Sequence, residues 1–289
     1  MCGAMLRLHS AGVPQQSRCR APAGPRRFEK RPFPSVLRVR LAALVIRSAL
    51  WFCRRVFQHV IRPRLFLNAG FRMKTVRVGI VGAGFAARYH VECLRRVYGL
   101  DAVIAGVTSL RRESRESFGA AHGIAVYEDI GRMIPHVDVL DVCSPPYAHA
   151  EAIMAAAGAG RGIICEKPLT GAFGPAGDES FRGNRADKAR MLEEVLETLR
   201  RLAAAVREAG VFFGYAENFI YAPAVQKERE IVEKTKAQIL RMYGEESHNG
   251  SASPVYGIWR FAGGGSLIGK GCHPLGALLY LKRREGIAP

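Results

Sequence analysis

Residues 76–87 have the sequence VRVGIVGAGFAA, in which a short apolar run leads directly into Gly82-Ala83-Gly84-Phe85-Ala86-Ala87. The run of valine and isoleucine predicts a strand over 76–81, and the residues from Phe85 onward predict a helix. A G-x-G-x-x-[GA] pattern between a strand and a helix is typical of dinucleotide-binding proteins. We therefore predict that this loop binds the diphosphate of NAD or NADP.

Each residue of the motif has a physical task. Gly82 permits the tight turn, and Gly84 leaves out a side chain where the diphosphate must approach. Ala87 lets the helix pack closely on the strand. Phe85 stands at the helix N-terminus, whose unpaired N–H groups and positive dipole end favour an anionic ligand. These four residues are our candidates for cofactor binding in this loop.

Strand and helix patterns alternate on both sides of this motif. We predict further strands at residues 102–107, 137–143, 162–165 and 211–215, and helices at residues 85–97, 111–122, 149–157 and 188–209. This alternation predicts an α/β fold, a Rossmann-type doubly wound parallel sheet, over residues 73–218. A glycine-rich stretch at residues 170–184 is interpreted as a surface loop.

The pattern changes after residue 218. We predict a helix at residues 223–234 and strands at residues 239–243 and 255–262. We therefore expect residues 219–289 to form an incomplete α+β domain for substrate binding and oligomerisation.

The formal net charge of +18 is unevenly distributed. Residues 1–72 hold 15 of the 43 lysines and arginines and one acid, Glu29, so the remainder is nearly balanced. This distribution argues against nucleic acid as a partner. The apolar run 41–46 is too short to cross a membrane. Residues 1–72 are either a transit peptide or, as we favour, sequence upstream of a true start at Met73.

Seven cysteines occur without any C-x-x-C pair. Free thiols of this kind are typical of a reducing compartment, so we expect a cytoplasmic protein without disulfides. We also see no zinc-ligand spacing, and we expect no metal.

The second predicted strand is followed by Ser109-Leu110-Arg111-Arg112, without the acid that usually binds the ribose hydroxyls of NAD. Ser109 could contact a ribose hydroxyl or a 2′-phosphate, and Arg111 or Arg112 could pair with that phosphate. This favours NADP over NAD, unless both arginines are solvated residues of the next helix.

Three further stretches are DVCSPPYAH at 141–149, CEKPL at 165–169 and AENFIYAP at 216–223. Together with the glycine motif they resemble the glucose–fructose oxidoreductase/inositol dehydrogenase (Gfo/Idh/MocA) family, from about residue 76 to residue 281.

The resemblance implies roles for individual residues. Ser144, Pro145 and His149 would lie beside the nicotinamide ribose, and Glu166 would contact the ribose side of the cofactor. Lys167 would reach the substrate and the nicotinamide. The peptide bond between Lys167 and Pro168 would be cis.

The position of Lys167 supports a catalytic role on physical grounds. It follows a short buried strand, at the end of a sheet where α/β proteins bind ligands. Its ammonium could hydrogen-bond a substrate hydroxyl and favour the alkoxide that precedes hydride loss. The alternative is an ordinary surface lysine.

Residues 259–267 and 271–274 resemble the family's Gly-Gly-Gly segment and its Asp-x-Gly-x-His motif. His273 matches the histidine, whereas Gly269 stands in place of the aspartate, which puts two-residue acid–base chemistry in doubt. His273 could act alone as general base, or be a core histidine. Lys270 could add a second cation, although we favour a solvated residue; Tyr221 and His248 are weaker candidates for substrate contact.

The resemblance implies an NAD(P)-dependent oxidoreductase that transfers hydride from a sugar, inositol or related polyol. The alternatives are an NAD-dependent glycoside-cleaving enzyme of the same family and a non-catalytic nucleotide-binding fragment. The family closes its substrate site with a large sheet that also forms the oligomer interface. Because 71 residues cannot build that sheet, we expect a C-terminally truncated chain whose full-length relatives are homo-oligomers.

Overall fold

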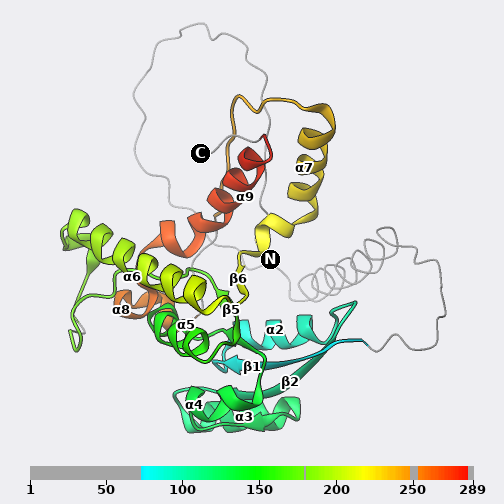
Figure 1. Ribbon diagram of the computed structural model, residues 1–289. Coiled ribbons are helices and arrows are strands. Elements are labelled where there is room, and N and C mark those ends of the chain that lie inside the picture. Colours follow the sequence, from blue (N-terminus) through cyan, green and yellow to red (C-terminus); the bar gives the residue numbers. More distant parts are fainter. Residues whose placement is uncertain (1–72, 179, 248–252, 286–289) are drawn as a thin grey trace, which may run out of the picture. The chain divides into compact units, whose positions relative to one another are not determined.

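The computed structural model describes residues 73–178, 180–247 and 253–285 (Figure 1). The described residues belong to one compact unit of the chain. The segment 1–72, interpreted above as a transit peptide or upstream sequence, lies outside the described residues.

A six-stranded sheet forms the centre of this unit, with the strand order β3-β2-β1-β4-β5-β6. All of its neighbouring strands are parallel. The strands are β1 (Thr75–Val81), β2 (Asp101–Thr108), β3 (Ala125–Val126), β4 (Val139–Val142), β5 (Gly162–Glu166) and β6 (Phe213–Ala216). The predicted doubly wound Rossmann sheet is therefore confirmed. The order reverses between β1 and β4, which is where such sheets bind ligands beyond the carboxyl ends of their strands.

Helices connect the strands, and all but α4 lie close to positions predicted from the sequence. They are α2 (Phe85–Leu94), α3 (Arg112–His122), α4 (Ile130–Met133), α5 (His149–Gly158) and α6 (Lys188–Ala209), with short 3-10 turns at Ile134–His136, Pro146–Ala148 and Gly183–Arg185. No helix of the described residues is long and apolar enough to cross a membrane.

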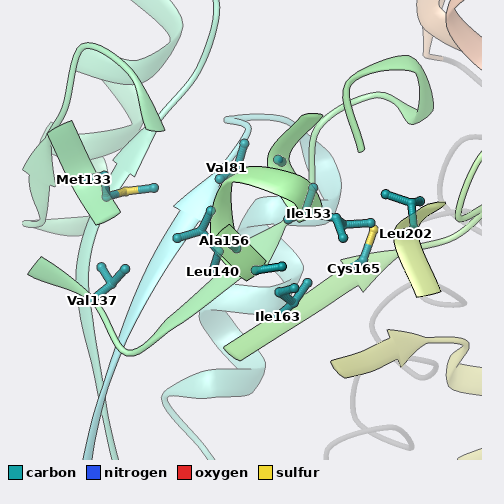
Figure 2. Close-up of a cluster of buried hydrophobic side chains, with 12 residues drawn as sticks. Val81, Met133, Val137, Leu140, Ile153, Ala156, Ile163, Cys165 and Leu202 are labelled. Carbon is teal, nitrogen blue, oxygen red and sulfur yellow. The ribbon is translucent and has the colours of Figure 1, made fainter. Parts of the chain in front are cut away.

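The sheet buries apolar side chains on both faces, as the Val- and Ile-rich strands predict. In one cluster Leu140 and Ile163 of the sheet pack with Ile153 and Ala156 of α5 (Figure 2). In the other, Ile80 and Val107 pack against Val91 of α2 and Phe118 of α3. Because both faces are covered, the strand ends that carry the site residues are held rigidly.

The region after β6 differs from our expectation. Its described elements are all helical: η4 (Asn218–Tyr221), α7 (Pro223–Thr235), η5 (Pro254–Gly257), α8 (Trp259–Ala262), a π-helical segment (Leu267–Gly271) and α9 (Cys272–Arg283). The strands predicted at residues 239–243 and 255–262 are wrong. The backbone N–H and carbonyl groups of a strand need hydrogen-bond partners. Here side chains, and not a neighbouring strand, provide these hydrogen bonds. The Ile239 N–H donates to Glu285 Oε1 at 2.7 Å, and the Ile239 carbonyl accepts from Lys282 Nζ at 2.9 Å.

The glycine-rich stretch 170–184 is only partly the surface loop that we predicted. Its first residues are buried, because Ala172 exchanges hydrogen bonds with two residues around α8. The Ala172 N–H donates to the Gly263 carbonyl at 2.9 Å, and Trp259 Nε1 donates to the Ala172 carbonyl at 2.9 Å. This loop thus ties the C-terminal segment to the end of β5.

Candidate cofactor and catalytic site

The glycine loop has the geometry that a diphosphate requires. Gly82 has φ +111°, its N–H donates to the Thr108 carbonyl at 2.8 Å, and a Cβ here would lie 2.8 Å from the backbone of Cys143. Gly84 caps α2, and a Cβ here would meet nothing within 4 Å, so the space before the helix is open. Ala87 is completely buried, whereas Phe85 is 86% exposed.

A cavity of about 400 Å³ opens beside this loop. Arg111 lines it, whereas Arg112 pairs with Glu116 at 2.7 Å. Ser109 shapes the loop, because its Oγ donates to the Arg111 carbonyl at 3.2 Å. Sequence analysis missed most of the lining, although Ser114, Ser117 and Ala121 recur at helical spacing on α3. The lining residues are Ala83, Arg88, Arg111, Glu113, Ser114, Ser117, Phe118, Ala121 and His122.

The loop after β4 contains a buried hydroxyl without a partner. Ser144 Oγ makes no hydrogen bond within the described part of the chain, although it is buried. Such a group fits a site that a polar ligand completes. The neighbouring Pro145 is half-buried.

His149 does not face this site, in contrast to the direct cofactor contact that we expected. Its side chain is fully buried, with Nδ1 3.0 Å from the Pro168 carbonyl and Nε2 2.8 Å from the Ser144 carbonyl. Burial lowers the pKa of His149, although both carbonyl groups favour its protonated form. A neutral ring donates to one of them at a time. His149 therefore braces the Ser144 loop against Pro168.

Glu166 ends β5 and lies in a cluster with His90 of α2 and Asp141 of β4. His90 Nδ1 is 2.9 Å from both carboxylate oxygens of Asp141, and its Nε2 is 3.0 Å from Glu166 Oε1. Burial opposes the charge on His90, but its hydrogen bonds to Asp141, Cys143 and Glu166 outweigh this and raise its pKa. Burial likewise opposes the charge on Glu166, but His90 and the Lys167 amide lower its pKa.

Lys167 follows directly, and the peptide bond to Pro168 is cis, as expected. Its N–H donates to Glu166 Oε2 at 2.9 Å, and its Nζ donates to the Gly269 carbonyl at 3.0 Å. The ammonium also lies 5.8 Å from the ring centroid of Tyr256. At the position where the resemblance implies an aspartate, the chain therefore offers a backbone carbonyl to Lys167.

His273 stands one helical turn after Gly269, and Glu217 orients it. His273 Nδ1 lies 2.6 Å from Glu217 Oε1, which also accepts the Phe219 N–H at 3.1 Å, and the His273 and Phe219 rings stack at 4.3 Å. The carboxylate makes Nδ1 the protonated nitrogen. Within the described residues Nδ1 is the only ring nitrogen of His273 with a hydrogen-bond partner, so Nε2 is left as the basic nitrogen.

The charge of Lys167 affects the pKa of Cys272, the residue before His273. Burial raises the pKa of the Cys272 thiol to about 11, and Lys167 acts in the opposite direction. Lys167 thus lies close to the start of α9, the helix that carries His273, although 106 positions separate the two residues in the sequence.

Two groups of three side chains have the composition of a metal site. They are His90, Asp141 and Cys143, and Glu217, Cys272 and His273, with donor atoms within 4.8 Å of one another. In each group a carboxylate already holds the imidazole, which accounts for the grouping without a cation. The absence of a metal stays a prediction.

The roles of the weaker candidates stay predictions. Tyr221 is 70% exposed, Lys270 is half-buried, and His248 lies outside the described residues. Sequence analysis missed two residues that the fold does bring in. His90 stands eight positions after Gly82 as a polar residue on the sheet-facing side of α2, and Glu217 was quoted in a motif without a role.

The sheet order, the glycine loop and the open helix N-terminus define a dinucleotide-binding Rossmann protein. Residues 76–176 match the model of the GFO_IDH_MocA family, described as an oxidoreductase family with an NAD-binding Rossmann fold. Over this region the chain is similar to the Gfo/Idh/MocA oxidoreductases, and the match indicates a fold that binds a nicotinamide dinucleotide.

Curated relatives agree with this assignment. The chain is 36% identical over 103 residues to an inositol 2-dehydrogenase of Cereibacter sphaeroides, covering 35% of this chain and 30% of the relative. It is 32% identical to glucose-6-phosphate 3-dehydrogenase of Bacillus subtilis, covering 32% of this chain and 26% of the relative. A levoglucosan dehydrogenase of Pseudarthrobacter phenanthrenivorans is 27% identical, and the match covers 72% of this chain and 52% of the relative. The chain therefore spans about a quarter to a half of these relatives.

Solved structures show the same fold. GenD2 from gentamicin A biosynthesis, in complex with NAD, gives a TM-score of 0.56 at 20% identity, covering 74% of this chain and 56% of the other. An NAD-binding protein from Listeria innocua gives a TM-score of 0.55 at 21% identity, covering 72% of this chain and 55% of the other.

Proposed function

We propose that the protein is an NAD(P)-dependent dehydrogenase that oxidises a hydroxyl group of a sugar, inositol or related polyol. The observation that carries this proposal is the hydrogen bond that joins Lys167, at the carboxyl end of β5, to the segment that leads into His273. The Lys167 ammonium lies 3.0 Å from the carbonyl one turn before His273, and Glu217 orients the His273 ring. The names of the dehydrogenase relatives support the substrate class.

The two side chains divide the acid–base work. His273 Nε2 takes the proton of the substrate hydroxyl, while Nδ1–H remains bonded to the Glu217 carboxylate. The Lys167 ammonium donates to the same oxygen and favours the developing alkoxide. When bound, the nicotinamide ring accepts the hydride. Gly82, Gly84, Phe85 and Ala87 hold the diphosphate, and Ser144, Pro145 and Glu166 lie on the nicotinamide side.

The cavity beside Ala83 is the proposed place of the adenosine half. Its lining includes the cations Arg88 and Arg111 and a single carboxylate, Glu113. We propose NADP as the preferred cofactor, because Arg111 faces this cavity without the ion pair that Arg112 makes. Replacement Arg111→Ala should weaken NADPH binding more than NADH binding.

A panel of sugars, inositols and sugar acids with NAD and NADP tests the function. We expect reduced nicotinamide to form with at least one polyol, and Lys167→Ala to lower kcat by roughly 10²- to 10⁴-fold with the dinucleotide still bound. A wild-type protein that binds the dinucleotide but reduces none across the panel would contradict the proposal. Release of sugar without net nicotinamide reduction would instead favour glycoside cleavage.

A further inference from the structure

His90 is a buried imidazole between two carboxylates from two different strands. Its side chain is 13% exposed, and those of Asp141 and Glu166 are 1% and 20% exposed. Both ring nitrogens lie within 3.0 Å of a carboxylate oxygen. Carboxylates accept hydrogen bonds, so both nitrogens must carry protons and the ring is an imidazolium.

The positive charge on His90 and the negative charges on Asp141 and Glu166 stabilise one another. Asp141 receives only one further hydrogen bond within the described residues, from the Cys143 thiol at 3.6 Å. Without a cation, Asp141 and Glu166 would be two partly or fully buried carboxylates that face the same space, and one of them would take up a proton. The imidazolium thus keeps Glu166 ionised and in place.

Glu166 in turn holds the backbone of Lys167. Its Oε1 faces His90, and its Oε2 accepts the Lys167 N–H at 2.9 Å. A continuous chain of hydrogen bonds therefore runs from Asp141 through His90 and Glu166 to Lys167. Small displacements of a reacting group are costly, because catalysis depends on sub-ångström placement.

We propose that His90 is a positioning residue, whose imidazolium fixes Glu166 and, through the Lys167 amide, the place of the Lys167 ammonium. The catalytic consequence rests on the function proposed above for Lys167, whereas the charge on His90 and the placement of Lys167 do not. The competing interpretation is an ion pair that only fastens α2 to the sheet. That interpretation predicts a loss of stability without a specific effect on Lys167.

The first test measures the charge of His90 in the wild-type chain, by nitrogen NMR of ¹⁵N-labelled histidine. The groups that face the ring are Asp141 from β4, Glu166 from β5 and the Cys143 thiol. We expect both ring nitrogens to stay protonated from about pH 6 to about pH 9. A neutral His90 ring at pH 7 would overturn the proposal.

The second test measures the placement of Lys167 without any substrate. Reductive methylation, followed by peptide mass spectrometry, should label Lys167 several-fold faster in His90→Phe than in wild type. Lys188 should react at an unchanged rate, because its ammonium donates to the carbonyls of Gly183 and Ala186. Equal Lys167 rates in the two proteins would refute a positioning role.

The third test separates placement from stability in the working enzyme. We expect kcat of His90→Phe to fall by roughly 10- to 100-fold, with dinucleotide Kd close to that of wild type. If that variant does not fold, the double variant His90→Phe/Asp141→Asn is used in its place. It removes one of the two carboxylates that the loss of His90 leaves without a cation. His136→Phe is the control, because that ring is exposed and stacks on Tyr127. Wild-type kcat in a folded His90 variant would overturn the proposal.

Chemical rescue then locates the effect. Added imidazole should restore turnover to His90→Ala and not to Lys167→Ala. Equal restoration of both would place the effect elsewhere and contradict the proposal. If the wild type oxidises no polyol, the function proposed above fails, while the NMR and labelling results still decide whether His90 is charged and holds Lys167.

Discussion

Lys167 and His273, the two residues that we propose for catalysis, differ in how the fold supports them. Lys167 directly follows a strand of a sheet with an apolar core on each face, and its backbone N–H donates a partly buried hydrogen bond to Glu166. His273 begins a helix in a segment without strands among the described residues, whose own apolar core is small: Val225, Ala277 and Leu281. Its one ring hydrogen bond there goes to Glu217, just after β6. The sheet thus supplies rigidity to both residues, directly for Lys167 and through a single hydrogen bond for His273.

The largest effect is expected in the glycine loop. At Gly82 a Cβ would meet backbone 2.8 Å away, and φ is +111°. Gly82→Ala should therefore cost about 2 kcal/mol or more of unfolding free energy, or prevent folding. Chemical denaturation followed by circular dichroism measures this.

Gly84→Ala is the matched control, because a Cβ there meets nothing within 4 Å. This variant should fold normally, yet its methyl group should occupy diphosphate space and weaken dinucleotide binding. Normal stability of Gly82→Ala would contradict the close approach of the two loops.

The next effect tests the single support of His273. Glu217→Gln keeps the shape but removes the charge that orients Nδ1–H, so kcat should fall by roughly 10- to 100-fold. Steady-state kinetics with the fastest polyol checks this. Glu228→Gln serves as control, since Glu228 also has a buried, unpaired oxygen but lies on α7. A kcat for Glu217→Gln equal to that of the control would separate Glu217 from catalysis.

A smaller effect concerns pH and the His90 cluster. The folded state raises the pKa of His90 above its ordinary 6.5, since the carboxylates outweigh burial. Its stabilising contribution is thus complete below about pH 6.5 and declines as pH rises. Glu166 has a lowered pKa, so its contribution is present above its ordinary 4.5 and is lost as pH falls.

Urea denaturation between about pH 6.5 and about pH 8 should therefore show stability falling with pH in wild type. The fall should be absent in His90→Phe/Asp141→Asn. Thiol ionisation in the unfolded chain becomes important only above this interval. Parallel profiles for the two proteins would show that His90 is not a charged group in the folded state.

The smallest effect lies in the C-terminal segment, where side chains replace strand pairing. Glu285→Gln should speed hydrogen exchange of the Ile239 amide and leave the unfolding midpoint almost unchanged. Glu230→Gln is the control, because Lys234 and Lys227 lower the pKa of that exposed carboxylate to about 2 without touching residue 239. Unchanged exchange at Ile239 in Glu285→Gln would show that this contact does not order the segment.

The sequence predicted what local pattern determines. Apolar periodicity located the sheet and α6, whose observed bounds equal the predicted ones, because Asp187 caps its start and Gly210 its end. The position of Lys167 directly after a predicted strand also placed it at the carboxyl end of the sheet, where α/β proteins bind ligands. His90 and Glu217 were missed as partners because their pairings join residues 51 to 76 positions apart, and no local pattern encodes such contacts.

The errors have a related cause. Residues 239–243 and 255–262 are rich in apolar and aromatic residues, as strands are, but a strand forms only where a partner strand is present. Likewise His149 matched a family motif, but motif position does not determine whether a side chain faces a cleft or the interior. Tertiary context decided each of these cases.

The central claim is that a nicotinamide dinucleotide lies across the loop at Gly84 and along the Arg111 cavity. Fluorescence titration of NADPH and NADH into the full chain, beside Gly84→Ala, tests it most directly. The account predicts saturable binding of both, tighter for NADPH, with clear weakening in Gly84→Ala. Absence of saturable binding in folded wild-type protein, or equal affinity in Gly84→Ala, would contradict it.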